Sequence, residues 1–262
     1  MQQAVPLANH DKTYMQHYLF FDNKLLLTND NKIPLSSEKV LLETRFSLDS
    51  DEECIAAVVD HVPQNYRTVG LRDSYDLLPW QYYKRAGKAA ELLYWEQTHQ
   101  YCGRCGTKLI KTSAISKICP KCHKEEWPML SPAIIVLVHN ADKILLVRSN
   151  TFCGEYYGLV AGFVELGESV EEAVEREIKE ETQLKVEKVQ YFGSQPWPYP
   201  QGMMLGFFAH YKSGEICLQT SELVAGDWFD IHHLPEIPKP LSMARQLIDH
   251  YINTYNYKQD TI

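Results

Sequence analysis

The pattern of hydrophobic and polar positions divides the chain into strand-like and helix-like runs. Helical spacing of apolar residues is found at 80–99, 170–182 and 242–255. Short apolar or alternating runs, typical of strands, occur at 17–21, 25–27, 54–59, 66–71, 133–138, 144–147, 186–193, 203–211 and 224–230. Asp22-Asn23 separates the first two runs as a turn. Strands and helices mixed in this order predict an α/β or α+β fold.

Composition narrows the class of protein. The chain has 262 residues, 45% of them hydrophobic, which suits one or two domains with a large core. The net charge of −8 argues against binding nucleic acid or an anionic membrane by overall charge alone. The longest apolar run, 133–138, is far short of a membrane span, and the first twenty residues lack a secretory pattern. We therefore expect a cytoplasmic protein without a membrane partner.

Four of the seven cysteines form two close pairs. Cys102 and Cys105 are separated by two residues, as are Cys119 and Cys122, and thirteen residues lie between the pairs. In a chain without an export signal this spacing predicts a tetrahedral zinc site, because a redox CxxC motif would not explain a second pair nearby. With all four positions filled by protein, the zinc is expected to be structural.

The segment 161–184 (AGFVELGESVEEAVEREIKEETQL) contains the most informative helix. Ser169 and Glu172 predict a capping box at its start. Glu177 and Glu181 then fall in line with the apolar stripe, where core residues are expected, and Glu180 lies beside them. Like charges four residues apart repel, and a helix C-terminus disfavours anions. Three carboxylates in this place predict a compensating cation such as Mg²⁺ or Mn²⁺, whereas Lys or Arg partners would be strained for all three.

The same segment resembles the Nudix hydrolase signature, G-x5-E-x7-R-E-U-x-E-E-x-G-U, where U is apolar. Eight of the nine specified positions match. The departure is Gln183, where the family has a glycine that ends the helix in a left-handed conformation. We expect Gln183 to cost about 1 kcal/mol of backbone strain without removing a ligand. The matching positions are Gly162, Glu168, Arg176, Glu177, Ile178, Glu180, Glu181 and Leu184.

The resemblance implies an α/β/α sandwich that hydrolyses a nucleoside diphosphate linked to another group. In the family, residues matching Glu177 and Glu181 bind divalent metal, and the latter also helps to activate water. Glu180 and the carbonyl of Ala161 match further metal ligands, and Arg176 matches the residue that orients the carboxylates. The resemblance thus implies Mg²⁺ or Mn²⁺, more than one ion per subunit, besides one Zn²⁺.

A second segment resembles the SQPWPFPxS array of the NADH pyrophosphatase subfamily. It begins at Ser194, and Tyr199 and Gly202 replace Phe and the final Ser. Alternating Pro and aromatic residues are expected to form a stiff wall of polyproline type on which flat rings can stack. A rigid structural loop or a Pro-rich ligand segment is the alternative. The resemblance assigns substrate contacts to Gln195, Pro196, Trp197, Pro198, Tyr199, Pro200, Gln201 and Gly202.

The order of segments also resembles that subfamily. We expect an N-terminal α/β domain at 1–98, a zinc ribbon at 99–128 and a catalytic Nudix domain at 129–262. The resemblance implies a homodimer that cleaves NAD(H) into AMP and nicotinamide mononucleotide, and a pocket that could accept NAD-capped RNA. Further implied sites are the metal ligand Glu222 and the substrate contacts Arg72, Trp127, Phe163 and Ala244, with core packing as the alternative for the aromatic rings.

Three other functions are compatible with parts of this pattern. A broader diphosphatase acting on ADP-ribose or dinucleoside polyphosphates would not need the array at 194–202. A catalytically inactive nucleotide or RNA sensor would not need Glu177, Glu180 and Glu181 together. A purely structural zinc-ribbon adaptor would need none of these carboxylates.

Overall fold

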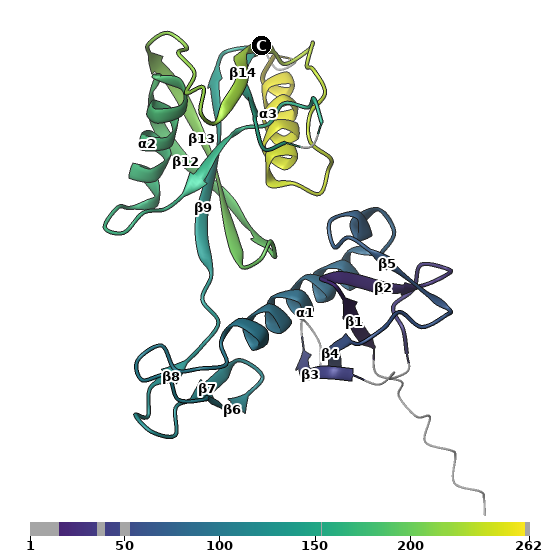
Figure 1. Ribbon diagram of the computed structural model, residues 1–262. Coiled ribbons are helices and arrows are strands. Elements are labelled where there is room, and N and C mark those ends of the chain that lie inside the picture. Colours follow the sequence, from purple (N-terminus) through teal and green to yellow (C-terminus); the bar gives the residue numbers. More distant parts are fainter. Residues whose placement is uncertain (1–15, 36–39, 48–52, 153, 260–262) are drawn as a thin grey trace, which may run out of the picture. The chain divides into compact units, whose positions relative to one another are not determined.

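A computed structural model describes residues 16–35, 40–47, 53–152 and 154–259 of the chain. The chain divides into two compact units, Met1–Pro128 and Met129–Ile262, which are described separately (Figure 1). No helix in the described ranges combines the length and apolar character that a bilayer crossing requires.

The first unit combines a mixed sheet, a long helix and a small three-stranded sheet. The mixed sheet has the order β3-β4-β1-β2-β5, and β1 runs parallel to β4. Both residues of the predicted Asp22-Asn23 turn have positive φ, as two-residue hairpin turns of the favoured hand require. The elements are β1 (His17–Phe21), β2 (Lys24–Thr28), β3 (Val40–Ser47), β4 (Glu53–Val59), β5 (Tyr66–Val69), the 3-10 helix η1 (Asp73–Asp76), α1 (Trp80–Thr98), β6 (Ile110–Ser113), β7 (Ser116–Ile118) and β8 (Glu125–Glu126).

A buried ion cluster joins the small sheet to α1. The carboxylate of Glu96 lies 3.0 Å from Lys117 Nζ and 2.6 Å from Lys111 Nζ. Lys117 is only 5% exposed, donates to the carbonyl of His99 and lies 4.5 Å above the ring of Trp95. A buried lysine is tolerated only when it is paired and hydrogen-bonded in this way. The cluster therefore holds the β6–β7 hairpin against the C-terminal half of α1.

The second unit is built on a six-stranded sheet. Its order is β12-β13-β9-β10-β14, and β11 pairs with β9. The β13 and β9 strands are parallel, whereas the other pairs are antiparallel. The elements are β9 (Ser131–Asn140), β10 (Lys143–Ser149), β11 (Val160–Phe163), α2 (Val170–Thr182), β12 (Lys185–Trp197), β13 (Gly202–Ser213), β14 (Leu223–Asp230) and α3 (Met243–Gln259).

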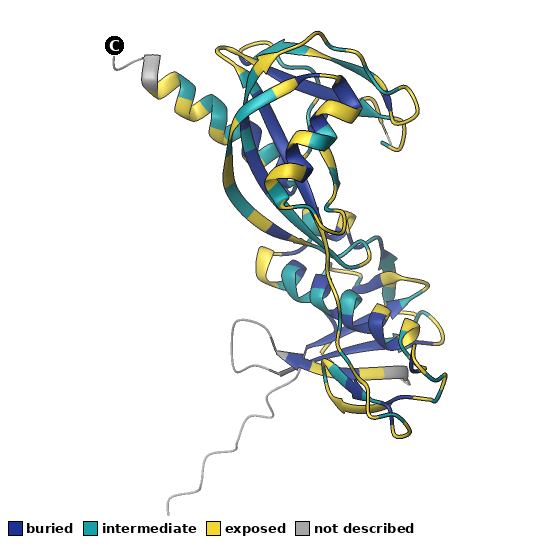
Figure 2. Cartoon of the chain, turned by 90° about the vertical axis from the view of Figure 1, so that its left-hand side faces the viewer, coloured by how far each residue is buried: buried dark blue, intermediate teal, exposed yellow. Residues whose placement is uncertain are grey.

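Alternating residues of β9 supply both faces of this sheet. Ile134, Val136 and Val138 share a core cluster with the apolar stripe of α2. Ile135 and Leu137 share the opposite cluster with α3. A strand buried on both faces has no polar alternation, which is why 133–138 is a continuous apolar run. The sheet lies between α2 and α3 (Figure 1), and its strands carry buried positions (Figure 2).

The predicted mixed α/β class is confirmed, and the three predicted helices are present within a few residues of their expected bounds. Every predicted strand is also present. The sequence pattern did not predict β3, β11, η1 or the strands of the small sheet around the cysteines, β6 to β8. These elements are short or carry exposed polar residues, so their pattern does not stand out.

Candidate active site and zinc ribbon

Helix α2 begins and ends at the residues that its sequence predicts. Ser169 Oγ accepts from the backbone N–H of Glu172 at 3.2 Å, and the Glu172 carboxylate accepts from the Ser169 N–H at 2.7 Å. At the other end, Gln183 adopts φ 61° and ψ 8°, the left-handed conformation normally given to glycine. These ends fix the register in which the glutamates of α2 meet the sheet.

Arg176 is the centre of a carboxylate network. Its guanidinium donates to Glu168 at 2.6 and 3.0 Å, to Glu177 at 2.8 Å and to Glu180 at 3.0 Å. It also donates to the carbonyl of Phe163 at 2.9 Å. The five donors of arginine in a fixed fork make this possible. Arg176 therefore serves two of the three helix carboxylates, Glu177 and Glu180, one more than the sequence suggested, and does not serve all three.

Glu181 is the carboxylate that Arg176 does not reach. Its residue is 5% exposed, and Oε2 is buried with no hydrogen-bond partner among the described residues. Burial, followed by repulsion from the neighbouring carboxylates of Glu177, Glu222 and Glu180, raises the pKa of Glu181 to about 8. Burial also raises the pKa of Glu177. An isolated buried carboxylate is costly, so this position favours either a proton or a cation.

Glycine at position 162 allows Glu177 to approach the sheet. A Cβ atom built on Gly162 would lie 1.9 Å from Glu177 Oε1, far inside van der Waals contact. Gly162 and the exposed Ala161 lie in β11, which pairs with β9. The strand therefore brings the backbone of this segment directly against the α2 carboxylates.

The loop before β14 brings Glu222 to the same cluster. The Gln219 N–H donates to the carbonyl of Glu181 at 2.9 Å, and Gln219 Nε2 donates to Glu222 Oε1 at 3.1 Å. The charge of Glu222 contributes to the raised pKa values of both Glu177 and Glu181. Gln219 was not singled out from the sequence, and only its spacing from Glu222 within this loop could have indicated it.

The carboxylate cluster has a suitable chemistry for a hard cation. It offers only oxygen donors, the ligand type that Mg²⁺ and Mn²⁺ take, and one of them is buried without a partner among the described residues. The carboxylate oxygens nevertheless lie farther from one another than the sulfurs of the cysteine cluster do. Within the described ranges, only Cys102, Cys105, Cys119 and Cys122 bring three or more ligand atoms within 4.8 Å of one another.

The segment 194–202 is a β-hairpin, which differs from the expected polyproline wall. Residues 194–197 continue β12 and pair with 202–205 of β13, and Pro196 is tolerated because β12 is an edge strand of the sheet. A cis peptide bond precedes Pro200 in the turn. The rings of Trp197 and Tyr199 pack edge to face with centroids 5.0 Å apart. Both aromatic residues are half-buried.

Two residues of this hairpin have close neighbours. Gln195 is buried, and its Nε2 donates to the carbonyl of Leu241 at 2.8 Å, just before α3. A Cβ atom on Gly202 would lie 3.0 Å from the carbonyl oxygen of Trp197, so a larger residue fits there only after a small shift. The hairpin is thereby connected to the start of α3, where Ala244 is buried within the first helical turn.

The remaining candidate contacts are found in both units. Phe163 is 64% exposed, and Trp127, just after β8, is 50% exposed, so neither ring is a core residue. Arg72 is exposed and precedes η1. Arg72 and Trp127 belong to the first unit, whereas the glutamates, the hairpin and Ala244 belong to the second.

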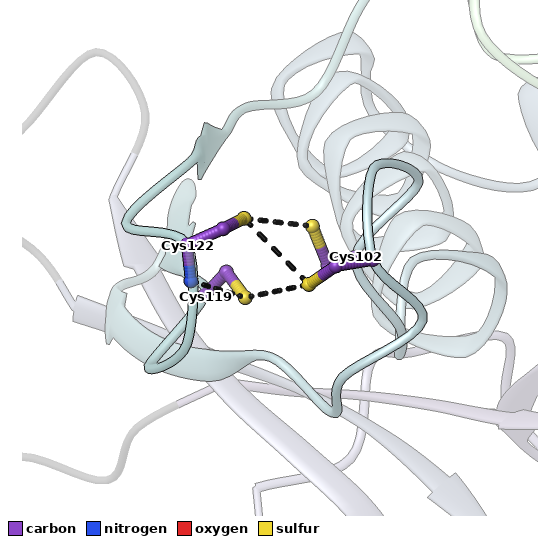
Figure 3. Close-up of side chains that lie close together, drawn as sticks. Cys102, Cys119 and Cys122 are labelled. Atoms are coloured by element: carbon purple, nitrogen blue, oxygen red, sulfur yellow. Dashed lines mark hydrogen bonds between the residues drawn. The ribbon is translucent and has the colours of Figure 1, made fainter.

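The four cysteines form one compact sulfur cluster (Figure 3). Three Sγ–Sγ distances are 3.5 to 3.6 Å, too long for disulfides and close to the roughly 3.8 Å edge of a tetrahedron with Zn–S bonds of about 2.3 Å. Backbone N–H groups of Arg104 and Cys122 donate to the sulfurs of Cys102 and Cys119. The donor set and spacing fit a structural zinc ion.

Comparison with known families identifies both parts of this architecture. Residues 129–250 match the NUDIX domain, and residues 97–126 match the NADH pyrophosphatase zinc ribbon domain. A crystal structure of a Nudix hydrolase from Nitrosomonas europaea superimposes with a TM-score of 0.51 at 20% identity, covering 60% of this chain and 93% of that one. This likeness supports the fold, an α/β/α domain of the Nudix type.

Curated relatives extend the similarity through the zinc ribbon. An "NAD-capped RNA hydrolase NudC" of Pseudomonas fluorescens (strain Pf0-1) is 43% identical over 171 residues, which cover 65% of this chain and 62% of that protein. The protein of the same name from Pseudomonas putida (strain W619) is 42% identical over 187 residues, covering 71% and 66%. The match thus spans less than two thirds of these relatives. The chain therefore carries a Nudix domain and an NADH pyrophosphatase zinc ribbon.

Proposed function

We propose that the protein hydrolyses the diphosphate bond of NAD(H) to AMP and nicotinamide mononucleotide, and removes NAD caps from RNA by the same cleavage. The observation that carries this proposal is the buried, unpartnered Oε2 of Glu181 within the Nudix carboxylate cluster. The names of the relatives and the array at 194–202 support NAD(H) as the substrate over other dinucleotides.

Divalent metal would be held by the carboxylate cluster. The proposed ligands of Mg²⁺ or Mn²⁺ are the carbonyl of Ala161 and the carboxylates of Glu177, Glu180, Glu181 and Glu222. Bound metal would polarise the phosphoryl oxygens, neutralise charge that develops on them and lower the pKa of water. One Zn²⁺ would be held by the four cysteines as a structural ion.

The side chains of the chain would prepare the reaction in distinct ways. Glu181 would accept the proton of the attacking water, because no donor among the described residues competes for its Oε2. Arg176 would hold Glu177 and Glu180 in position through its hydrogen bonds. The exposed ring of Phe163, next to this network through its own carbonyl, would stack on a base of the substrate.

Further substrate contacts are proposed outside the carboxylate cluster. The hairpin 195–202 and the backbone at Ala244 would contact the dinucleotide, and the connection from Gln195 to Leu241 supports their joint action. Trp127, with an exposed ring, and Arg72, with a positive charge, are also proposed substrate contacts. We further propose the domain division 1–98, 99–128 and 129–262, a homodimer and a cytoplasmic location.

A substrate panel tests this function. Wild type and Glu181→Gln are incubated with NADH, NAD⁺, ADP-ribose and NAD-capped RNA, each with Mg²⁺, Mn²⁺ or EDTA, and products are separated by chromatography. Glu175→Gln is the matched control, because Glu175 lies on the exposed face of α2. The proposal is supported if wild type and Glu175→Gln release AMP and nicotinamide mononucleotide only with metal, and Glu181→Gln does not release them. Preferred cleavage of ADP-ribose would favour the broader diphosphatase, and binding without turnover would favour the sensor.

A further inference from the structure

The zinc ribbon is basic, although the whole chain is acidic. Residues 99–128 contain five Lys and one Arg against two Glu, in a chain whose net charge is −8. A zinc ion with four thiolates would add a charge of −2, which leaves the segment at +2. In contrast, residues 165–181 contain eight Glu against one Arg and one Lys. Charge is therefore strongly segregated along the sequence.

Some cations of the ribbon already have carboxylate partners. Lys111 and Lys117 pair with Glu96, and Lys124 pairs with Glu126. Three cations remain exposed and form no ion pair among the described residues: Arg104, Lys108 and Lys121. We refer to these three as the ribbon cations. Because internal pairing does not use them, their charge is available to an external polyanion.

The two knuckles present their cations at equivalent positions. Arg104 directly precedes Cys105, and Lys121 directly precedes Cys122, so each is the last residue between the two cysteines of its pair. The knuckles face each other across the sulfur cluster (Figure 3). A bound zinc ion would hold both turns rigid, which lowers the entropy cost of presenting two cations together.

An exposed aromatic ring lies next to the third cation. Tyr101 and Lys108 are directly paired in an antiparallel bridge that closes the base of the first knuckle. Tyr101 is 63% exposed, so its ring is accessible from solvent. Rings that can stack on bases, beside cations that can contact phosphates, are the combination with which proteins bind single-stranded nucleic acid.

We propose that the zinc ribbon binds the single-stranded RNA that follows an NAD cap, with the ribbon cations on phosphates and Tyr101 stacked on a base. The inference extends the proposed function, since it assigns a second contact to capped RNA that free NAD(H) lacks. The overall charge of −8 does not oppose it, because screening at physiological salt confines charge effects to about 8 Å.

Uncapped RNA tests the proposal independently of catalysis. Binding of the full-length protein to a fluorescein-labelled, unstructured 20-nucleotide RNA with a 5′-hydroxyl is measured by anisotropy between 50 and 200 mM salt. The test variant is Arg104→Gln/Lys108→Gln/Lys121→Gln. The control is Lys24→Gln/Lys143→Gln/Lys185→Gln, which removes three exposed lysines outside the ribbon. Zinc content and NADH hydrolysis are measured for every variant.

Neutralising the ribbon cations should reduce the salt dependence. Each phosphate contact on a single strand contributes a slope of about −0.7, so losing three contacts should flatten the log–log slope by about 2. Wild type should therefore lose about 20-fold more affinity than the test variant over this salt range. Tyr101→Ala should weaken binding by about tenfold or more, whereas Tyr101→Phe should keep it, because stacking needs the ring and not the hydroxyl.

The outcomes separate this inference from the proposed function. Equal RNA affinity and slope in the test and control variants, with zinc bound, would overturn the inference. Binding of wild type to anionic phosphatidylglycerol vesicles but not to RNA would also overturn it. If the test variant lost hydrolysis of NAD-capped RNA but kept that of NADH, the inference would be supported. If neither wild type nor any variant hydrolysed NADH while wild type still bound RNA, the proposed function would fail and the RNA site would stand.

Discussion

Glu181 provides a measurable link between the carboxylate cluster and stability. Replacing it by Gln removes a carboxyl group whose folded-state pKa is about 8, against an ordinary glutamate pKa of 4.5. A raised carboxyl pKa means that the folded state prefers the protonated form. The penalty on folding is therefore absent below about pH 4.5 and grows as the pH rises through 8.

The magnitude follows from the two pKa values. Linkage predicts that, because of Glu181, the unfolding free energy of the metal-free protein falls by about 3 kcal/mol between pH 5 and pH 8. The Gln variant does not have this cost, although its buried amide adds a constant penalty of about 1–3 kcal/mol at every pH. The difference in Tm between variant and wild type should therefore move by about 6–12 °C in favour of the variant over this range.

Thermal unfolding followed by circular dichroism in EDTA, from pH 5 to pH 8, measures this difference. Glu175→Gln, an exposed change on the same helix, should show a constant difference from wild type. Saturating Mg²⁺ should raise the Tm of wild type at pH 8 more than that of Glu181→Gln, since a cation binds the folded carboxylate. A pH-independent difference for Glu181→Gln in EDTA would refute the reasoning that this carboxylate is buried without a partner.

Three further substitutions test other parts of the account. Gly162→Ala should lower NADH hydrolysis by more than tenfold, because its Cβ would displace the Glu177 carboxylate, which lies 1.9 Å away. The control Gly193→Ala, with open space at its Cβ, should keep activity. Equal rates for the two variants would contradict this prediction. Gln183→Gly should raise the unfolding free energy by about 1 kcal/mol in urea titrations, since φ is 61°, and a loss would contradict the strain argument. Glu96→Gln leaves the buried Lys117 without its carboxylate and should lower the unfolding free energy of the first unit by about 3 kcal/mol; no change in urea unfolding would contradict this.

Local rules predicted most of the α2 region from the sequence. The capping box, the end of the helix at Gln183 and the placement of Glu181 on the buried stripe all depend on residues a few positions apart. The zinc ribbon was predictable for the same reason, since each cysteine pair forms its own turn. These features need no knowledge of the tertiary arrangement.

Contacts between distant segments were not predictable in this way. The sharing of Arg176 among Glu168, Glu177 and Glu180 depends on how the loop before α2 folds back onto the helix. The hairpin at 194–202 was mistaken for a polyproline segment because its pairing with β13 follows from sheet register and not from composition. The cluster around Glu96 requires α1 and the β6–β7 hairpin to meet.

The most direct test of the central claim is a Mg²⁺ titration of NADH hydrolysis by wild type, Glu181→Gln and Glu175→Gln, with AMP and reduced nicotinamide mononucleotide quantified as products. The account predicts equal amounts of the two products for wild type and Glu175→Gln, only with metal, and a loss of at least 100-fold in kcat for Glu181→Gln. Full activity of Glu181→Gln, or cleavage of NADH in EDTA, would contradict a metal-dependent reaction centred on this carboxylate.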